Sequence, residues 1–182
     1  ERILTATFLQ QPEAGRRDGL IHAIYGGVYG KVNDVVNSHP QTGDLMPVMT
    51  HLGPAVPCGL TRYASRVFGD DYRDNFFACL FNLHKVTRHV LSPAGPTFNS
   101  QDSDFLVSSD PDFHPTDVLE DADGSLVVID TGAWYKLCCP TSQLAKPDVL
   151  GAIYRIRRKN GPRVEDPRGL KLDWAGMKVA DL

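Results

Sequence analysis

A histidine and an aspartate lie three residues apart near the middle of the chain and form the best candidate for acid–base chemistry. His114 could accept the proton of a hydroxyl group, because an imidazole titrates close to neutral pH. Asp117 could orient the imidazole ring and stabilise its charged form. In the alternative interpretation, His114 packs before Pro115 and Asp117 caps a turn. His84 and His89 are expected at solvent-facing strand positions.

Oxygen-bearing side chains elsewhere offer ligands for a metal. Asn82 and Asp130 could join this pair and hold Ca²⁺, if the fold brings all four residues to one opening. The run Asp121-Ala122-Asp123-Gly124 resembles the start of an EF-hand loop but lacks its bidentate acid, so we interpret it as a hairpin turn. We therefore predict no metal site formed wholly within this chain.

Several familiar motifs are missing from the sequence. The glycine-rich run 26–30 lacks the spacing of a dinucleotide fingerprint or a P-loop, and there is no Gly-x-Ser-x-Gly motif. The four cysteines, at positions 58, 79, 138 and 139, contain no Cys-x-x-Cys pair, so structural zinc and covalent c-type haem are not expected here. They permit three fully paired disulfide arrangements. The adjacent Cys138 and Cys139 could form a strained vicinal disulfide or remain two buried thiols.

Composition restricts the class of protein. The 182 residues include 42% hydrophobic side chains, which suffices for a sizeable core in one domain or part of a larger one. Nineteen Lys and Arg against 22 Asp and Glu give a net charge of −3, so the basic surface of a nucleic-acid-binding protein is not expected. No apolar run approaches the ~20 residues of a transmembrane helix. The chain opens without the pattern of a signal peptide, so we expect such a peptide to be absent or already removed.

Short apolar runs alternate with turn residues along the chain, which is typical of an all-β protein. They predict strands at residues 4–9, 20–25, 32–36, 76–81, 86–91, 105–107, 118–120, 125–130 and 152–157. Asp123-Gly124 lies between two of these runs and predicts a β-hairpin, because glycine tolerates a positive φ. Residues 92–105, rich in turn-forming and polar side chains, predict a loop, and only 171–182 could begin a helix.

Two stretches of the chain share one order of elements. Each begins with a short strand after a proline, at Pro57 or Pro115, then turns and continues into two hydrophobic strands. Such repetition predicts a β-propeller, in which radial packing buries both faces of each blade. At ~40–50 residues per blade, the chain would hold about three to four blades. We therefore predict a partial propeller over residues 1–170 and a linker, or the start of a following segment, over 171–182.

Four runs carry a resemblance to a known family. Residues 114–132 read HPTDVLEDADGSLVVIDTG and residues 151–156 read GAIYRI, while GGVYGK stands at 26–31 and PCGLTRY at 57–63. They resemble the membrane-bound dehydrogenase domain of planctomycete-type bacteria. That domain is similar to the six-bladed β-propeller of soluble quinoprotein glucose and sorbosone dehydrogenases. The resemblance covers most of residues 18–172.

The resemblance implies oxidation of a sugar or alcohol, with pyrroloquinoline quinone (PQQ) and Ca²⁺ bound in the full-length protein. It also implies a c-type cytochrome as electron acceptor and a periplasmic or cell-envelope location. His114 would take the hydroxyl proton while hydride moves to the quinone, and Arg62 or Lys31 would place a positive charge near the quinone oxygen. The cofactor-binding candidates are polar or aromatic side chains expected near the blade openings, namely Asn82, Asp130, Thr131, Trp134 and Lys31.

Two other functions fit the same architecture. One is a metal-dependent lactonase or hydrolase, and the other is a non-catalytic propeller that binds a glycan or another protein. A basic cluster near the end of the chain is interpreted as a solvated sheet edge or as a docking surface for a following domain. Its members are Arg155, Arg157, Arg158, Lys159, Arg163, Arg168 and Lys171.

Overall fold

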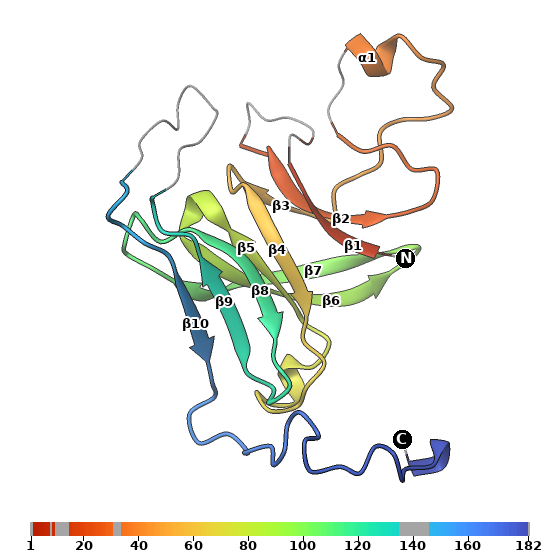
Figure 1. Ribbon diagram of the computed structural model, residues 1–182. Helices are drawn as coiled ribbons and strands as arrows, with labels where there is room; N and C mark the ends of the chain where they lie inside the picture. The colour runs from red at the N-terminus through yellow and green to blue at the C-terminus, as the bar shows by residue number, and fades with distance from the viewer. Residues whose placement is uncertain (1, 8, 10–14, 31–33, 135–145, 182) are drawn as a thin grey trace.

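The computed structural model of the chain describes residues 2–7, 9, 15–30, 34–134 and 146–181. Within these residues the chain forms three antiparallel sheets, each with its strands in consecutive order (Figure 1). The first sheet comprises β1 (Arg2–Ala6), β2 (Asp18–Ala23) and β3 (Thr50–Gly53). The second comprises β4 (Pro57–Arg62), β5 (Phe76–Leu80), β6 (Lys85–Ala94) and β7 (Thr97–Val107). The third comprises β8 (Pro115–Glu120), β9 (Leu126–Asp130) and β10 (Ala152–Ile156).

Helical structure is sparse in the described part of the chain, which confirms the all-β prediction at this level. The α-helix α1 covers Asp34–Asn37, and 3-10 turns occur at η2 (Asp70–Tyr72), η3 (Phe81–Leu83) and η4 (Val179–Asp181). No helix of these residues is long and apolar enough to cross a membrane.

Apolar side chains of the second and third sheets form the main core. The alternation expected of a strand is clear in β9, where Leu126, Val128 and Asp130 are buried and the residues between them are half-buried. Side chains with no more than 2% exposure fill this core, among them Tyr63, Phe77, Val86, Val118, Leu126 and Val128. Side chains of the second and third sheets therefore pack against each other in one shared core.

The first strands of the second and third sheets, β4 and β8, run side by side in the same direction (Figure 1). Gly59 of β4 faces Asp117 of β8 so closely that an added Cβ would lie 2.6 Å from the Asp117 Cα. A side chain at position 59 would therefore force the two strands apart. Thr5 Oγ1 donates a hydrogen bond of 3.1 Å to the Cys58 carbonyl oxygen, which links β1 to β4. The first strands of all three sheets thus adjoin one another in chain order.

The predicted hairpin at Asp123-Gly124 is confirmed. β8 and β9 pair from Pro115↔Asp130 to Glu120↔Leu126, and Gly124 has a φ of +73° in the connecting turn. The Tyr63 hydroxyl donates a hydrogen bond of 2.6 Å to the Gly124 carbonyl oxygen, so the core fixes the position of this turn.

Two local predictions are wrong, at residues 92–105 and 32–36, and one strand was missed. Residues 92–105 belong to the long β6–β7 hairpin, which turns at Gly95 (φ +58°), because ladder hydrogen bonds between two strands allow both faces to be polar. The described part of the predicted strand 32–36 lies in α1, which has Asp34 in its first turn, where a negative charge is favourable. The strand β3 escaped prediction because it is short and mostly polar. In the possible helix at 171–182, helical structure among the described residues is limited to the 3-10 turn η4.

Candidate functional site

Two histidines meet at the end of the sheets where β8 begins. His114 directly precedes β8, and His84 ends the turn η3 with a left-handed backbone (φ 52°, ψ 40°). Their ring centroids are 5.2 Å apart, and the Phe81 ring lies 4.6 Å from that of His114. Both histidines are half-buried. We call these two residues the His84–His114 pair.

Main-chain carbonyl oxygens orient both imidazole rings. Nδ1 of His84 lies 2.8 Å from the carbonyl oxygen of Phe113. Nδ1 of His114 lies 2.8 Å from the carbonyl oxygen of Gly132 and 3.0 Å from that of Asp112. A carbonyl oxygen can only accept a hydrogen bond, so each Nδ1 must carry a proton. In the neutral ring, Nε2 then holds the lone pair and is the nitrogen that can accept a proton.

Asp130 holds the turn that carries one of these carbonyls. Its Oδ1 accepts hydrogen bonds from the main-chain nitrogens of His114 and Gly132, each at 2.8 Å. Thr131 donates to the His114 carbonyl oxygen from its main-chain nitrogen at 3.1 Å and from Oγ1 at 3.3 Å. Asp130 is only 8% exposed. Asp130 and Thr131 therefore contact the main chain at His114 and Gly132. Through these contacts they hold in place the carbonyl oxygen that orients the His114 ring.

Two more of the predicted site residues lie in the segments that form this end of the sheets. Asn82 is exposed within η3, two residues before His84. Trp134 follows Gly132 by two residues and is 53% exposed. The structure therefore gathers His114, Asp130 and Thr131, with Asn82 and Trp134 in adjoining positions of the same segments.

Asp117 lies further along β8, beside Gly59. Its Oδ1 accepts a hydrogen bond of 2.9 Å from the main-chain nitrogen of Val118. The contacts described for Nδ1 of His114 are made by carbonyl oxygens, so the orienting role that the sequence suggested for Asp117 falls to the main chain.

Arg62 lies at the opposite end of β4 from the His84–His114 pair. Pro57 pairs with Leu80 at the histidine end, whereas Arg62 pairs with Phe76 five residues along, a strand length of roughly 15 Å. The Arg62 guanidinium forms an exposed ion pair with Asp74, with 2.6 Å between Nη2 and Oδ1. The structure therefore does not bring Arg62 and His114 to one reacting group.

Three further candidate residues, Lys31, Cys138 and Cys139, lie outside the described residues. Cys58 and Cys79 are free thiols. Burial, and then the negative charge of Asp117, raises the pKa of both thiols. Both thiols therefore stay protonated at neutral pH and are poor nucleophiles.

The described residues at the histidine end do not form a complete site for either implied cofactor. No group of three or more His, Cys, Asp or Glu side chains that could hold a metal occurs in the described ranges. PQQ carries three carboxylates and requires cations, but Arg62 lies elsewhere and Lys146 Nζ contacts both carboxylate oxygens of Asp112, at 2.6 and 2.8 Å. Imidazole, hydroxyl and indole groups instead suit a neutral ligand with several hydroxyl groups.

Two histidines lie in surroundings that the sequence pattern did not reveal. His84 was expected on a solvated strand, but the left-handed end of η3 turns its ring toward Phe113, which is 29 residues away. His89 was also expected in solvent and is fully buried, so that prediction is wrong. Its Nδ1 lies 2.7 Å from Asp102 Oδ1 and its Nε2 2.8 Å from Thr87 Oγ1. Polar partners on β6 and β7 thus permit its burial.

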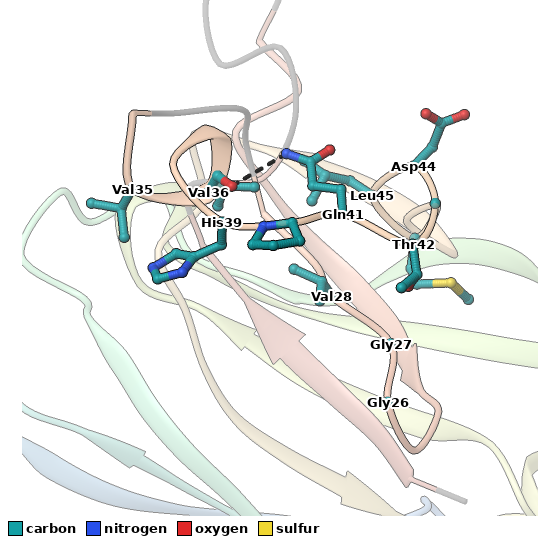
Figure 2. A pocket seen from close by; sticks show the side chains of 13 residues that line it. Gly26, Gly27, Val28, Val35, Val36, His39, Gln41, Thr42, Asp44 and Leu45 are labelled. Carbon is teal, nitrogen blue, oxygen red and sulfur yellow. Dashed lines mark hydrogen bonds between the residues drawn. The ribbon is translucent and has the colours of Figure 1, made fainter.

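A cavity of about 430 Å³ lies in the segment between β2 and β3 (Figure 2). Gly26, Gly27 and Val28 form one side, and residues 35, 36 and 39–46 form the other. The Gln41 side chain closes part of this second side by donating a hydrogen bond of 3.3 Å to the Val36 carbonyl oxygen. His39 and Asp44 are its ionisable lining residues, and they indicate no particular chemistry.

Comparison with protein families finds one match. A family model described as a domain of unknown function (DUF7133) matches residues 29–160, which include α1, β3 to β10 and the His84–His114 pair. Searches among curated proteins and among solved structures give no match.

Proposed function

The chain belongs to the DUF7133 family of domains of unknown function, and we propose that it forms part of a β-propeller that binds a sugar or alcohol for oxidation at the His84–His114 pair. The single observation that carries the proposal is the orientation of both imidazoles by main-chain carbonyls. This orientation leaves Nε2 of each neutral ring as the proton acceptor. The resemblance to quinoprotein dehydrogenases supplies the reaction class.

The sheet arrangement supports a propeller. In that architecture, short antiparallel sheets surround an axis and their first strands lie innermost. Here β4 and β8 are neighbours that run in the same direction, and Thr5 links β1 to β4. Both Pro57 and Pro115 begin their strands at the histidine end, so loops from neighbouring sheets converge there. A ligand at this end would contact two sheets at once.

In the proposed reaction, Nε2 of His114 accepts the proton of the substrate hydroxyl. The imidazolium that forms keeps its Nδ1–H bonds to the carbonyl oxygens of Gly132 and Asp112, which stabilise its positive charge. Asp130 is a positioning residue, because it holds the Gly132 turn through the main chain. The exposed indole of Trp134 offers an apolar face for a sugar ring.

Oxidation also requires a group that accepts hydride from the substrate carbon. At the histidine end, Arg62 is remote and Lys146 is paired with Asp112, so we assign quinone binding to none of the described residues there. The proposal for this part of the chain is therefore limited to substrate binding and proton acceptance.

The test is calorimetric titration of the protein with a panel of sugars and polyols, comparing His114→Ala with His51→Ala. His51 is an exposed histidine on β3 and is the matched control. We expect saturable binding that weakens at least tenfold in His114→Ala and stays within twofold in His51→Ala, with unchanged circular dichroism. Absence of binding to every sugar and polyol, or equal affinities in both variants, would contradict the proposal.

A second measurement separates oxidation from binding alone. The full-length protein is assayed for dye reduction with added PQQ and Ca²⁺. Sugar-dependent reduction that is lost in His114→Ala supports the dehydrogenase. Binding without reduction would instead favour a non-catalytic glycan-binding propeller, and chelator-sensitive lactone hydrolysis would favour the metal-dependent hydrolase.

A further inference from the structure

A second cavity, lined by polar and apolar residues, lies at the end of the sheets opposite the His84–His114 pair, where the β8–β9 hairpin turns. Its volume is about 490 Å³. Its walls come from three places, namely the hairpin turn, the loop after β4 and the segment after β10. We call it the arginine cavity, because Arg157, Arg158 and Arg163 all line it.

The charges of the arginine cavity do not balance. Its lining contains three arginines against one carboxylate, Asp123, which gives a formal charge of +2. Asp123 is already engaged, since its Oδ2 lies 3.1 Å from Nη2 of Arg157 and its Oδ1 lies 3.3 Å from Nη1 of Arg155. Arg155 lies outside the lining. Within the lining, Asp123 is paired with Arg157, so Arg158 and Arg163 carry the excess positive charge.

The guanidinium groups of Arg158 and Arg163 form no ion pair with a described carboxylate. Arg158 donates a hydrogen bond of 2.9 Å from Nη1 to the Phe68 carbonyl oxygen, which fixes the group but adds no negative charge. Among the described residues, Arg163 forms no ion pair. A held guanidinium and an unpaired one in a single cavity are suited to binding an anion, because each presents a planar fork of N–H donors.

The rest of the lining is largely apolar. Val67, Pro162, Val164 and Pro167 contribute to the walls beside the arginines. Inorganic phosphate would leave these apolar side chains exposed to water, whereas an organic phosphate could bury them against its carbon skeleton. A phosphate monoester carries a charge between about −1.5 and −2 at neutral pH, close to that required to balance the lining.

We propose that the arginine cavity binds a small organic phosphate, with its phosphate group on Arg158 and Arg163 and its organic part against Pro162 and Val164. The site lies at the end of β8 remote from the His84–His114 pair, so this proposal is independent of the proposed oxidation. It assigns part of the basic cluster near the end of the chain to ligand binding rather than to protection of a sheet edge.

The experiment is isothermal titration with phenyl phosphate at constant ionic strength, using wild type, Arg163→Gln and Arg2→Gln. Arg2 lies on β1, outside the arginine cavity, and its substitution removes the same charge. We expect wild type to bind saturably, Arg163→Gln to bind at least tenfold more weakly, and Arg2→Gln to stay within twofold of wild type. Val164→Glu, which adds a negative charge to the apolar wall, should also weaken binding at least tenfold.

Inorganic phosphate distinguishes the organic ligand from the free ion, and we expect it to bind at least tenfold more weakly than phenyl phosphate. Equal affinities for the two would overturn the assignment of the apolar wall. The site itself would be overturned by an absence of saturable binding in wild type, or by equal affinities in Arg163→Gln and Arg2→Gln. Circular dichroism of each variant confirms that a loss of affinity is not a loss of fold.

Discussion

Asp102 on β7 joins two sheets through its carboxylate, and we predict that Asp102→Asn destabilises the protein. Asp102 Oδ2 accepts a hydrogen bond of 2.6 Å from Thr50 Oγ1 on β3 of the first sheet. Oδ1 lies 2.7 Å from Nδ1 of the buried His89 and also accepts a hydrogen bond from Ser100 Oγ. An asparagine at this position removes the charge and replaces one acceptor oxygen by a donor.

The pKa of Asp102 sets the magnitude of the effect. Burial by itself would raise this pKa, but hydrogen bonds from His89, Ser100 and Thr50 lower it from 3.8 to about 2. This difference corresponds to roughly 2.5 kcal/mol of stability above pH 4, at about 1.36 kcal/mol per pH unit. The side chain is 31% exposed, and solvent screening reduces the value to about 1–2 kcal/mol.

The same pKa fixes the pH range of the effect. The folded-state pKa is lower than that of the unfolded chain, so the stabilisation is fully present above pH ~4. It is lost as the pH falls from ~4 towards 2, because the folded carboxylate then becomes protonated. The difference between wild type and Asp102→Asn should therefore shrink across this interval.

Urea unfolding, followed by circular dichroism between pH 7 and pH 3, measures the free energies. Asp104→Asn is the matched control, because Asp104 lies on the same strand and forms an exposed ion pair of 2.7 Å with Lys85. We expect this control to lose less than about 1 kcal/mol. The reasoning is refuted if Asp102→Asn is as stable as wild type at pH 7, or if its deficit does not shrink below pH 4.

Two further substitutions test how β4 and the loop that follows it contact the third sheet. Tyr63→Phe should lower the free energy of unfolding by about 1–3 kcal/mol, because the buried Gly124 carbonyl and the Phe68 amide both lose the Tyr63 hydroxyl as a partner. A loss below about 0.5 kcal/mol in urea unfolding would contradict this expectation. Gly59→Ala should lower the free energy of unfolding by at least about 2 kcal/mol, because the added Cβ would lie 2.1 Å from Asp117 Oδ1. The control is Gly43→Ala, whose added Cβ would have no neighbouring atom within 4 Å, so it should change the melting temperature little. Equal melting temperatures for the two alanine variants would refute the close approach of β4 and β8.

Local patterns in the sequence were sufficient for much of the secondary structure. The apolar run before Asp130 predicted β9, and Asp123-Gly124 predicted the turn, because both depend on residues within a few positions of each other. The same reasoning failed at 92–105. The polar residues there form a hairpin whose stability comes from pairing with β6, and composition does not reveal such pairing.

The candidate site depended on contacts between residues that lie far apart in the sequence. His84 and His114 are 30 positions apart and meet only because the turn after β5 and the start of β8 lie at one end of adjoining sheets. Arg62 is removed from them because β4 runs away from that end. The sequence by itself determined strands such as β9, whose side-chain alternation and turn residues act locally, but not β3 or the β6–β7 hairpin. Only the tertiary structure decided which polar groups converge, because this depends on the direction and packing of strands joined by long connections.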